Sequence, residues 1–84
     1  MDREQSEKFL KTLAPADSNF VEVGIELIEI REKAVLIESM TGIHAKRVWI
    51  PRSQVAFVDR GNFGLFLAVK RWWVNKENLW WMKA

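Results

Sequence analysis

Apolar residues change their spacing near residue 20, which divides the chain into a short helix and a series of strands. Before that point, one stripe at helical spacing is formed by Phe9, Leu10 and Leu13. The stripe predicts a helix over residues 2–13, with Asp2 placed to cap it. Because a helix of this length is marginal alone, we expect it to lean on the rest of the domain.

From Phe20 onward apolar and polar residues alternate, which predicts short, half-buried strands. The alternation changes phase at Leu27 and Ile28, which predicts either a bulge there or a strand end buried on both faces. Gly42 and residues 60–64 are predicted turns. The five predicted strands cover residues 20–30, 34–39, 45–50, 54–59 and 65–69.

Five short strands joined by short turns must protect their edges, and closing into a small barrel does so at this size. The pattern therefore predicts a mainly β, α+β fold built on a five-stranded barrel. Short connections favour an SH3-like over an OB-like barrel. We expect one domain of 84 residues, with an N-terminal helix in residues 1–14. The barrel core and a tryptophan-rich C-terminal segment would occupy residues 20–84.

The C-terminal segment fits two structures, a helix or a hairpin. Residues 71–77 can form two helical turns, and Asn78 suits the left-handed position that ends a helix. Leu79 would then pack back on the helix. In the alternative, residues 75–78 form the turn of a hairpin between two tryptophan-bearing strands. We favour the short C-terminal helix.

Composition excludes several classes of protein. The chain has no cysteine, which excludes disulfides and thiolate metal sites. It has no apolar run long enough to span a membrane, and Asp2, Glu4 and Glu7 stand where a signal peptide would be basic and then apolar. These features predict a cytoplasmic protein without a membrane partner.

Residues capable of catalysis are few and scattered. His44 is the single histidine, and no ligand pair has metal-binding spacing. No serine lies in a nucleophile elbow, and no glycine motif would cradle a phosphate. The sequence therefore predicts a protein that is not an enzyme and that uses neither a metal nor a cofactor.

The net charge of +2 conceals an asymmetry between the two halves. Residues 1–38 hold nine acidic and five basic residues, a net of −4. Residues 39–84 hold two acidic and eight basic residues, a net of +6. A basic half points to a polyanionic partner. The alternative is that arginine and lysine only solvate the outer face of the barrel.

Four tryptophans lie close together near the C-terminus, with basic residues among them. Adjacent tryptophans cannot both point inward from a regular element, so we expect at least one of each pair to be exposed. They could anchor a protein interface, seal a homodimer, stack unpaired bases, or only cap the end of the core. The candidate residues are Arg71, Trp72, Trp73, Trp80 and Trp81.

A second basic and aromatic segment covers residues 44–52. On a strand, Arg47 and Trp49 share a face and form a candidate outward stacking pair. An acidic peptide or a base could use that pair; the alternative is a plain amphipathic strand. The candidate binding residues of this segment and of the loop after the next strand are Lys46, Arg47, Trp49, Arg52 and Arg60.

Residues 33–38 read Lys-Ala-Val-Leu-Ile-Glu, and residues 49–54 read Trp-Ile-Pro-Arg-Ser-Gln. Together with residues 72–79, these strings resemble a group of small phage and mobile-element proteins that share a Trp-Ile-Pro-Lys/Arg-Ser-Gln motif. Asn78 stands where members of the group carry glycine. The resemblance implies a fold and a mobile-element setting, and it implies no mechanism.

The motif also has a structural explanation. Pro51 cannot donate a ladder hydrogen bond, so we expect the strand to end there. Ser53 or Gln54 would bond the backbone groups freed at that break, and Val55 would restart pairing. The alternative is that the motif is a binding site.

Two functions follow from these patterns. The first is a small binding module, encoded by a phage or mobile element, that acts by protein contact as an adaptor or inhibitor of a host machine. The second is a barrel that binds single-stranded nucleic acid through its basic residues and tryptophans, with salt-sensitive affinity. A homodimer sealed by the tryptophans is compatible with both.

Overall fold

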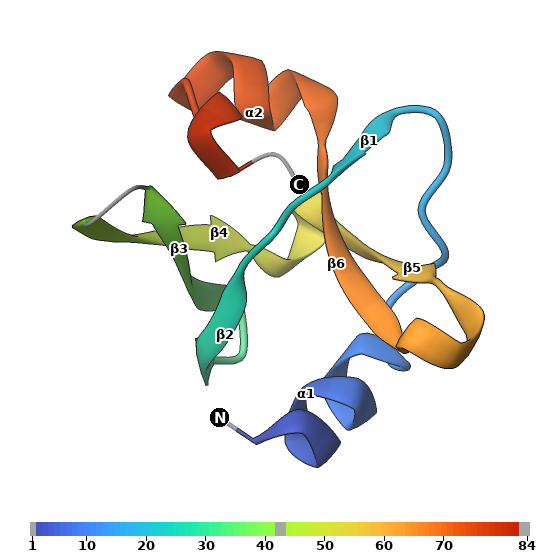
Figure 1. The fold of residues 1–84 in the computed structure, drawn as a ribbon. Coiled ribbons are helices and arrows are strands. Elements are labelled where there is room, and N and C mark those ends of the chain that lie inside the picture. The colour runs from blue at the N-terminus through green and yellow to red at the C-terminus, as the bar shows by residue number, and fades with distance from the viewer. Residues whose placement is uncertain (1, 42–43, 83–84) are drawn as a thin grey trace.

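A computed structural model describes residues 2–41 and 44–82, and it contains two three-stranded antiparallel sheets (Figure 1). The first sheet has the order β1-β6-β5, with β1 at Phe20–Glu22, β6 at Leu65–Lys70 and β5 at Val55–Asp59. The second has the order β2-β3-β4, with β2 at Glu26–Ile30, β3 at Ala34–Thr41 and β4 at His44–Pro51. The predicted turn at Gly42 lies outside the described residues.

The predicted SH3-like or OB-like barrel is wrong, because the two sheets do not close into one. The stretch predicted as one strand is divided into β1 and β2, which belong to different sheets. Between them, the N–H of Gly24 donates to Met82 O at 2.8 Å, and its carbonyl accepts from the Ser39 hydroxyl at 3.1 Å. Both backbone groups of Gly24 are therefore used outside a strand ladder, and the ladder stops there.

Of the two structures predicted near Leu27 and Ile28, the bulge is the one present. The pairing of β2 with β3 shifts register between Leu27 and Glu29. This extra residue changes which face of β2 the following side chains occupy, as the phase change in the sequence indicates.

The inner faces of both sheets form one hydrophobic core together with the two helices. Helix α1 (Arg3–Leu10) is capped by Asp2, whose carboxylate accepts the N–H of Gln5 at 2.8 Å. It ends three residues before the predicted boundary, and it docks through buried Phe9 and Leu10. Side chains with almost no exposure lie at the centre of the core: Val35, Ile37, Ile50, Val69, Val74 and Met82.

Helix α2 (Arg71–Glu77) forms as predicted, and the hairpin alternative is wrong. Asn78 adopts the left-handed conformation, with φ 54° and ψ 53°. The N–H of Leu79 then donates to Val74 O at 2.9 Å, and the N–H of Asn78 donates to Asn75 O at 3.3 Å. These two bonds form a Schellman ending, and they direct the chain back over the core.

The two helices lie at opposite ends of the molecule, α2 above the sheets and α1 below them in Figure 1. Three short 3-10 helices complete the described fold: η1 at Arg52–Gln54, η2 at Gly61–Phe63 and η3 at Trp80–Met82. In the part of the chain that the structure describes, no helix has the length and apolar character needed to cross a membrane.

Candidate binding surface

Helix α2 and η3 divide each tryptophan pair into one exposed and one inward ring. Trp72 is 50% exposed and Trp80 is 38% exposed, whereas Trp73 and Trp81 pack against the core. The prediction that adjacent tryptophans split in this way is confirmed. Two large apolar rings therefore face solvent on one short segment.

Neighbouring side chains hold both exposed rings in place. The Trp80 indole N–H donates to Asn75 Oδ1 at 2.8 Å. Trp72 meets Trp73 edge to face, with ring centroids 5.7 Å apart. The Lys76 ammonium lies over both of those rings, 5.7 Å from the Trp72 centroid and 5.3 Å from that of Trp73. The rings are thus oriented before any partner arrives, which lowers the entropy cost of binding.

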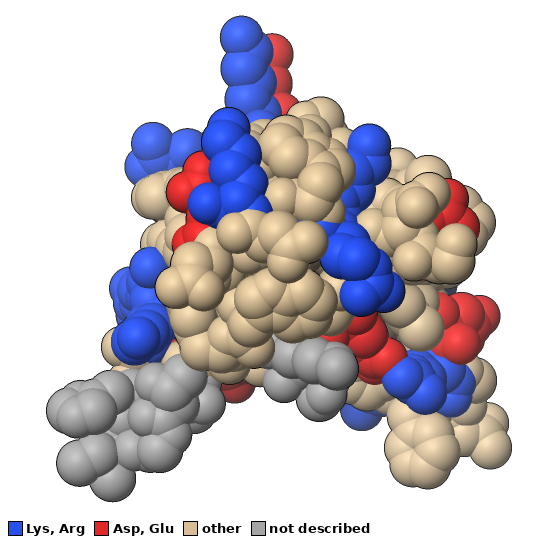
Figure 2. Space-filling model, turned by 90° about the horizontal axis from the view of Figure 1, so that it is seen from above, with Lys and Arg blue, Asp and Glu red and all other residues tan. Residues whose placement is uncertain are grey.

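We call this region the α2–η3 face and define it by Lys70, Arg71, Trp72, Asn75, Lys76 and Trp80. Figure 2 looks onto this end of the molecule and shows a tan centre without charged residues, surrounded by lysine and arginine side chains with some acidic side chains among them. Among the residues that the structure describes, no carboxylate forms an ion pair with a cation of the face. An open hollow of about 420 Å³ adjoins Trp72.

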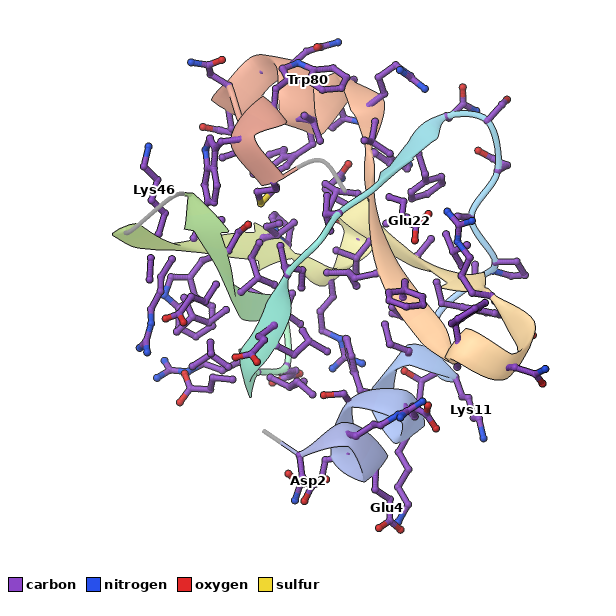
Figure 3. All side chains as sticks on the ribbon, in the orientation of Figure 1. Asp2, Glu4, Lys11, Glu22, Lys46 and Trp80 are labelled. Atoms are coloured by element: carbon purple, nitrogen blue, oxygen red, sulfur yellow. The ribbon has the colours of Figure 1, made fainter. Side chains whose placement is uncertain are left out.

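The cations of β4 are arranged differently. Arg47 Nε donates to Glu38 Oε2 on the neighbouring strand β3 at 2.7 Å. The predicted stacking of Arg47 on Trp49 is wrong: Trp49, 41% exposed, is covered by the Arg31 guanidinium, 5.0 Å from its centroid. Lys46 lies at the end of the β3–β4 hairpin, and its ammonium is 5.5 Å from the Trp81 centroid (Figure 3).

Arg60 is also neutralised within the fold. Its guanidinium binds both carboxylate oxygens of Glu22 on β1, and the Nε contact measures 3.2 Å. These hydrogen bonds, together with the charge of Glu22, raise the pKa of Arg60 above its ordinary value. Arg60 therefore stays charged throughout the usable pH range, and its positive charge is already paired with the carboxylate of Glu22.

The Arg52 side chain packs against α1 and does not form part of the exposed binding surface. Its guanidinium lies 5.0 Å from the Phe9 centroid, and its Nη1 donates to Arg31 O at 3.4 Å. In the Trp-Ile-Pro-Arg-Ser-Gln motif, β4 ends at Pro51 as predicted. The predicted backbone bonds from Ser53 or Gln54 are not among the described hydrogen bonds. Gln54 Nε2 donates instead to the Ser53 hydroxyl at 3.1 Å.

The structure therefore brings together only part of the predicted set. Arg71, Trp72 and Trp80 share one exposed face with their rings half open to solvent. Trp73 and Trp81 support that face from below. The other predicted residues, Lys46, Arg47, Trp49, Arg52 and Arg60, each contact another side chain of the fold.

The list of candidate residues from the sequence lacks Lys70, Asn75 and Lys76 of this face, and it lacks Asn19, which lines the adjoining hollow. Lys70 and Asn75 flank tryptophans, so proximity to Trp72 could have indicated them. Asn19 comes from the linker before β1, and its position depends on a backbone bond from Arg71 N–H to Asn19 O at 2.8 Å. No local sequence signal indicates that contact.

A second hollow, of about 290 Å³, lies between α1, β2 and β6. It is lined mainly by aliphatic side chains, with Arg3 and Glu26 as its charged residues. It has no exposed tryptophan and no excess of one charge, so it is the weaker candidate. Among residues 2–41 and 44–82, no three side chains are grouped as metal ligands.

Comparison with known proteins gives no relative from which a role could be carried over. No protein-family model matches the chain, and no match is found among curated proteins or among solved structures.

Proposed function

We propose that this chain is a small, non-catalytic binding module that contacts a partner protein through the α2–η3 face. It would act in the cytoplasm as an adaptor or inhibitor of a host machine and be encoded by a phage or mobile element. The observation that carries the proposal is the pair of exposed, oriented rings of Trp72 and Trp80 beside Arg71. Tryptophan and arginine are the residues most enriched at the energetic centres of protein interfaces.

Charge distribution favours a protein partner over a single-stranded nucleic acid. A single strand needs a basic path of several nucleotides, at least ~4 per barrel-type site. Arg47 and Arg60 add little net positive charge to such a path, because the carboxylates of Glu38 and Glu22 are paired with them. Helix α2 has 7 residues, which corresponds to a length of about 10 Å. That length suits one cluster of interface anchors.

The test compares three single-alanine variants as bait. Tagged protein captures partners from a bacterial lysate, and the captured protein is then purified and titrated against each variant. Trp72→Ala and Trp80→Ala should each weaken binding about 30-fold, which corresponds to ~2 kcal/mol for an interface anchor. Trp49→Ala is the matched control, since its ring has similar exposure but lies on β4. It should bind as the unmodified protein does.

Three outcomes would reject the proposal. One is a partner whose affinity falls equally in Trp49→Ala and Trp72→Ala. Another is salt-sensitive quenching of tryptophan fluorescence by mixed-sequence single-stranded DNA or RNA, which would support the nucleic-acid function. The last is a dimer in solution that Trp72→Ala converts to monomer, because a second copy of the chain would then cover the exposed rings that the proposal assigns to another protein.

A further inference from the structure

The hollow beside Trp72 has walls from two distant parts of the chain. It is lined by Asn19, Lys70, Arg71, Trp72 and Asn75. The Arg71 N–H donates to Asn19 O at 2.8 Å, which joins the segment before β1 to the start of α2. β1 also pairs with β6, with Phe20 opposite Lys70. The walls are therefore fixed by backbone contacts.

The polar groups available in this hollow are mainly hydrogen-bond donors. Lysine and arginine side chains can only donate. Asn75 Oδ1 accepts the Trp80 indole N–H at 2.8 Å, and the NH₂ of the same amide is a further donor. The lining therefore combines two positively charged side chains and two amides with an apolar ring, a composition suited to an anionic group.

The lining of the hollow contains no carboxylate. The nearest acidic residue in sequence, Asp17, uses its Oδ1 to accept the Asn19 N–H at 2.8 Å. Glu77 lies on α2 but does not line the hollow. Within the described residues, no acidic group competes for Lys70 or Arg71 as Glu38 does for Arg47.

The shape of the donor set favours a carboxylate over a phosphate. Phosphate sites usually use backbone N–H groups, and the Arg71 N–H is already bound to Asn19 O. The charged donors of the hollow are side chains, and the planar guanidinium of Arg71 matches a planar carboxylate. The exposed Trp72 ring offers an apolar surface to the residue next to that carboxylate.

We propose that this hollow receives the carboxylate of an aspartate or glutamate of the partner protein, with an adjoining apolar side chain packed on Trp72. The inference rests on the proposed function, because it names the chemistry of the partner at the same face. It identifies the partner's contact as a short acidic and apolar segment.

Nuclear magnetic resonance of the isotope-labelled protein tests this directly. The probes are acetyl-Leu-Glu-Leu-amide and its isosteric counterpart acetyl-Leu-Gln-Leu-amide, each titrated to millimolar concentration. The glutamate peptide should shift the Asn75 side-chain amide and the Trp72 indole signals. The affinity of the glutamine peptide should be lower by a factor of at least about ten, because this peptide lacks the charge that strengthens these hydrogen bonds.

Two double variants separate the hollow from general electrostatic attraction. Lys70→Gln with Arg71→Gln should abolish the shifts, while Lys8→Gln with Lys11→Gln removes the same charge from α1 and should leave them intact. Equal shifts with both peptides, or no shift at all, would overturn the inference. So would tighter binding of the 5′-phosphorylated dinucleotide pdTdT than of the glutamate peptide.

Failure here is distinguishable from failure of the proposed function. If Trp72→Ala and Trp80→Ala lose the captured partner but the glutamate and glutamine peptides bind alike, only the carboxylate inference falls. If capture of the partner does not depend on Trp72 and Trp80, the proposed function is rejected, and the carboxylate inference is rejected with it.

Discussion

Two regions of this chain combine tryptophan with arginine or lysine, and they differ in what the positive charges contact. Around β4, Arg47 binds Glu38, Arg31 covers Trp49, and Arg52 lies on Phe9. On the α2–η3 face, Lys76 lies over tryptophan rings, and Arg71 lines an open hollow without a carboxylate.

The comparison shows that a basic and aromatic segment is not by itself a binding site. In the first region the cations complete the fold, because an acidic or aromatic neighbour satisfies each of them. In the second region the rings and donors are oriented but still accessible to a partner. What distinguishes the two is the contact made by the arginines, which a composition count does not reveal: Arg31, Arg47 and Arg52 each meet an acidic or aromatic side chain, whereas within the described residues no such contact is recorded for Arg71.

The largest expected effect on stability distinguishes the two rings of one tryptophan pair, Trp72 and Trp73. Trp73→Ala should lower the free energy of unfolding by about 3 kcal/mol, because Trp73 packs against the core. Trp72→Ala should lower it by less than ~1 kcal/mol, because half of that ring is exposed. Urea denaturation followed by far-ultraviolet circular dichroism measures both. Equal losses would mean that Trp72 is a structural residue and not a separable part of the binding surface.

A smaller effect is expected at the end of α2. Asn78→Ala should cost about 1 kcal/mol, because alanine is disfavoured at φ 54°, and Asn78→Gly should cost nothing or stabilise. The same denaturation experiment applies, with Glu77→Ala, at an exposed position of α2, as a variant that leaves the left-handed position untouched. If alanine is tolerated at position 78 as well as glycine, the left-handed conformation there carries no measurable stability cost for a side chain.

The prediction with the smallest expected effect on stability concerns the arginines that are paired with carboxylates. Replacing Glu22 and Glu38 by glutamine releases Arg60 and Arg47 from their ion pairs. The double variant should then bind mixed-sequence single-stranded DNA with a log-log salt slope of about 1.4, or ~0.7 for each new phosphate contact, whereas the unmodified protein should show no salt-sensitive binding. Tryptophan fluorescence at several salt concentrations gives the slope. The absence of salt-sensitive binding by the double variant would show that these carboxylates do not mask the arginines.

Local features were predictable where the residues themselves determine the backbone. The Asp2 cap, the β2 bulge and the Asn78 ending of α2 follow from capping preferences and a phase change, and all three are present. The split of the tryptophan pairs follows from the geometry of adjacent residues. These signals lie within a few positions of one another in the sequence.

The wrong predictions concern contacts between distant residues. The break at Gly24 depends on Met82 and Ser39, which no local pattern connects to it. Likewise, Arg47 meets Glu38 only because the β3–β4 register places them opposite each other. The acidic first half and basic second half therefore neutralise each other partly in space, and the sequence asymmetry overstated the free positive charge.

The hydrogen bond from Gly24 to Met82 also makes one backbone proton a natural reporter. That amide can exchange with solvent deuterium only when η3 lifts away from the junction of the two sheets. Its exchange rate, compared with the rate of the fully unfolded chain, thus measures how often the segment carrying Trp80 opens. A partner bound to that segment would slow the exchange of the Gly24 amide proton without contacting Gly24.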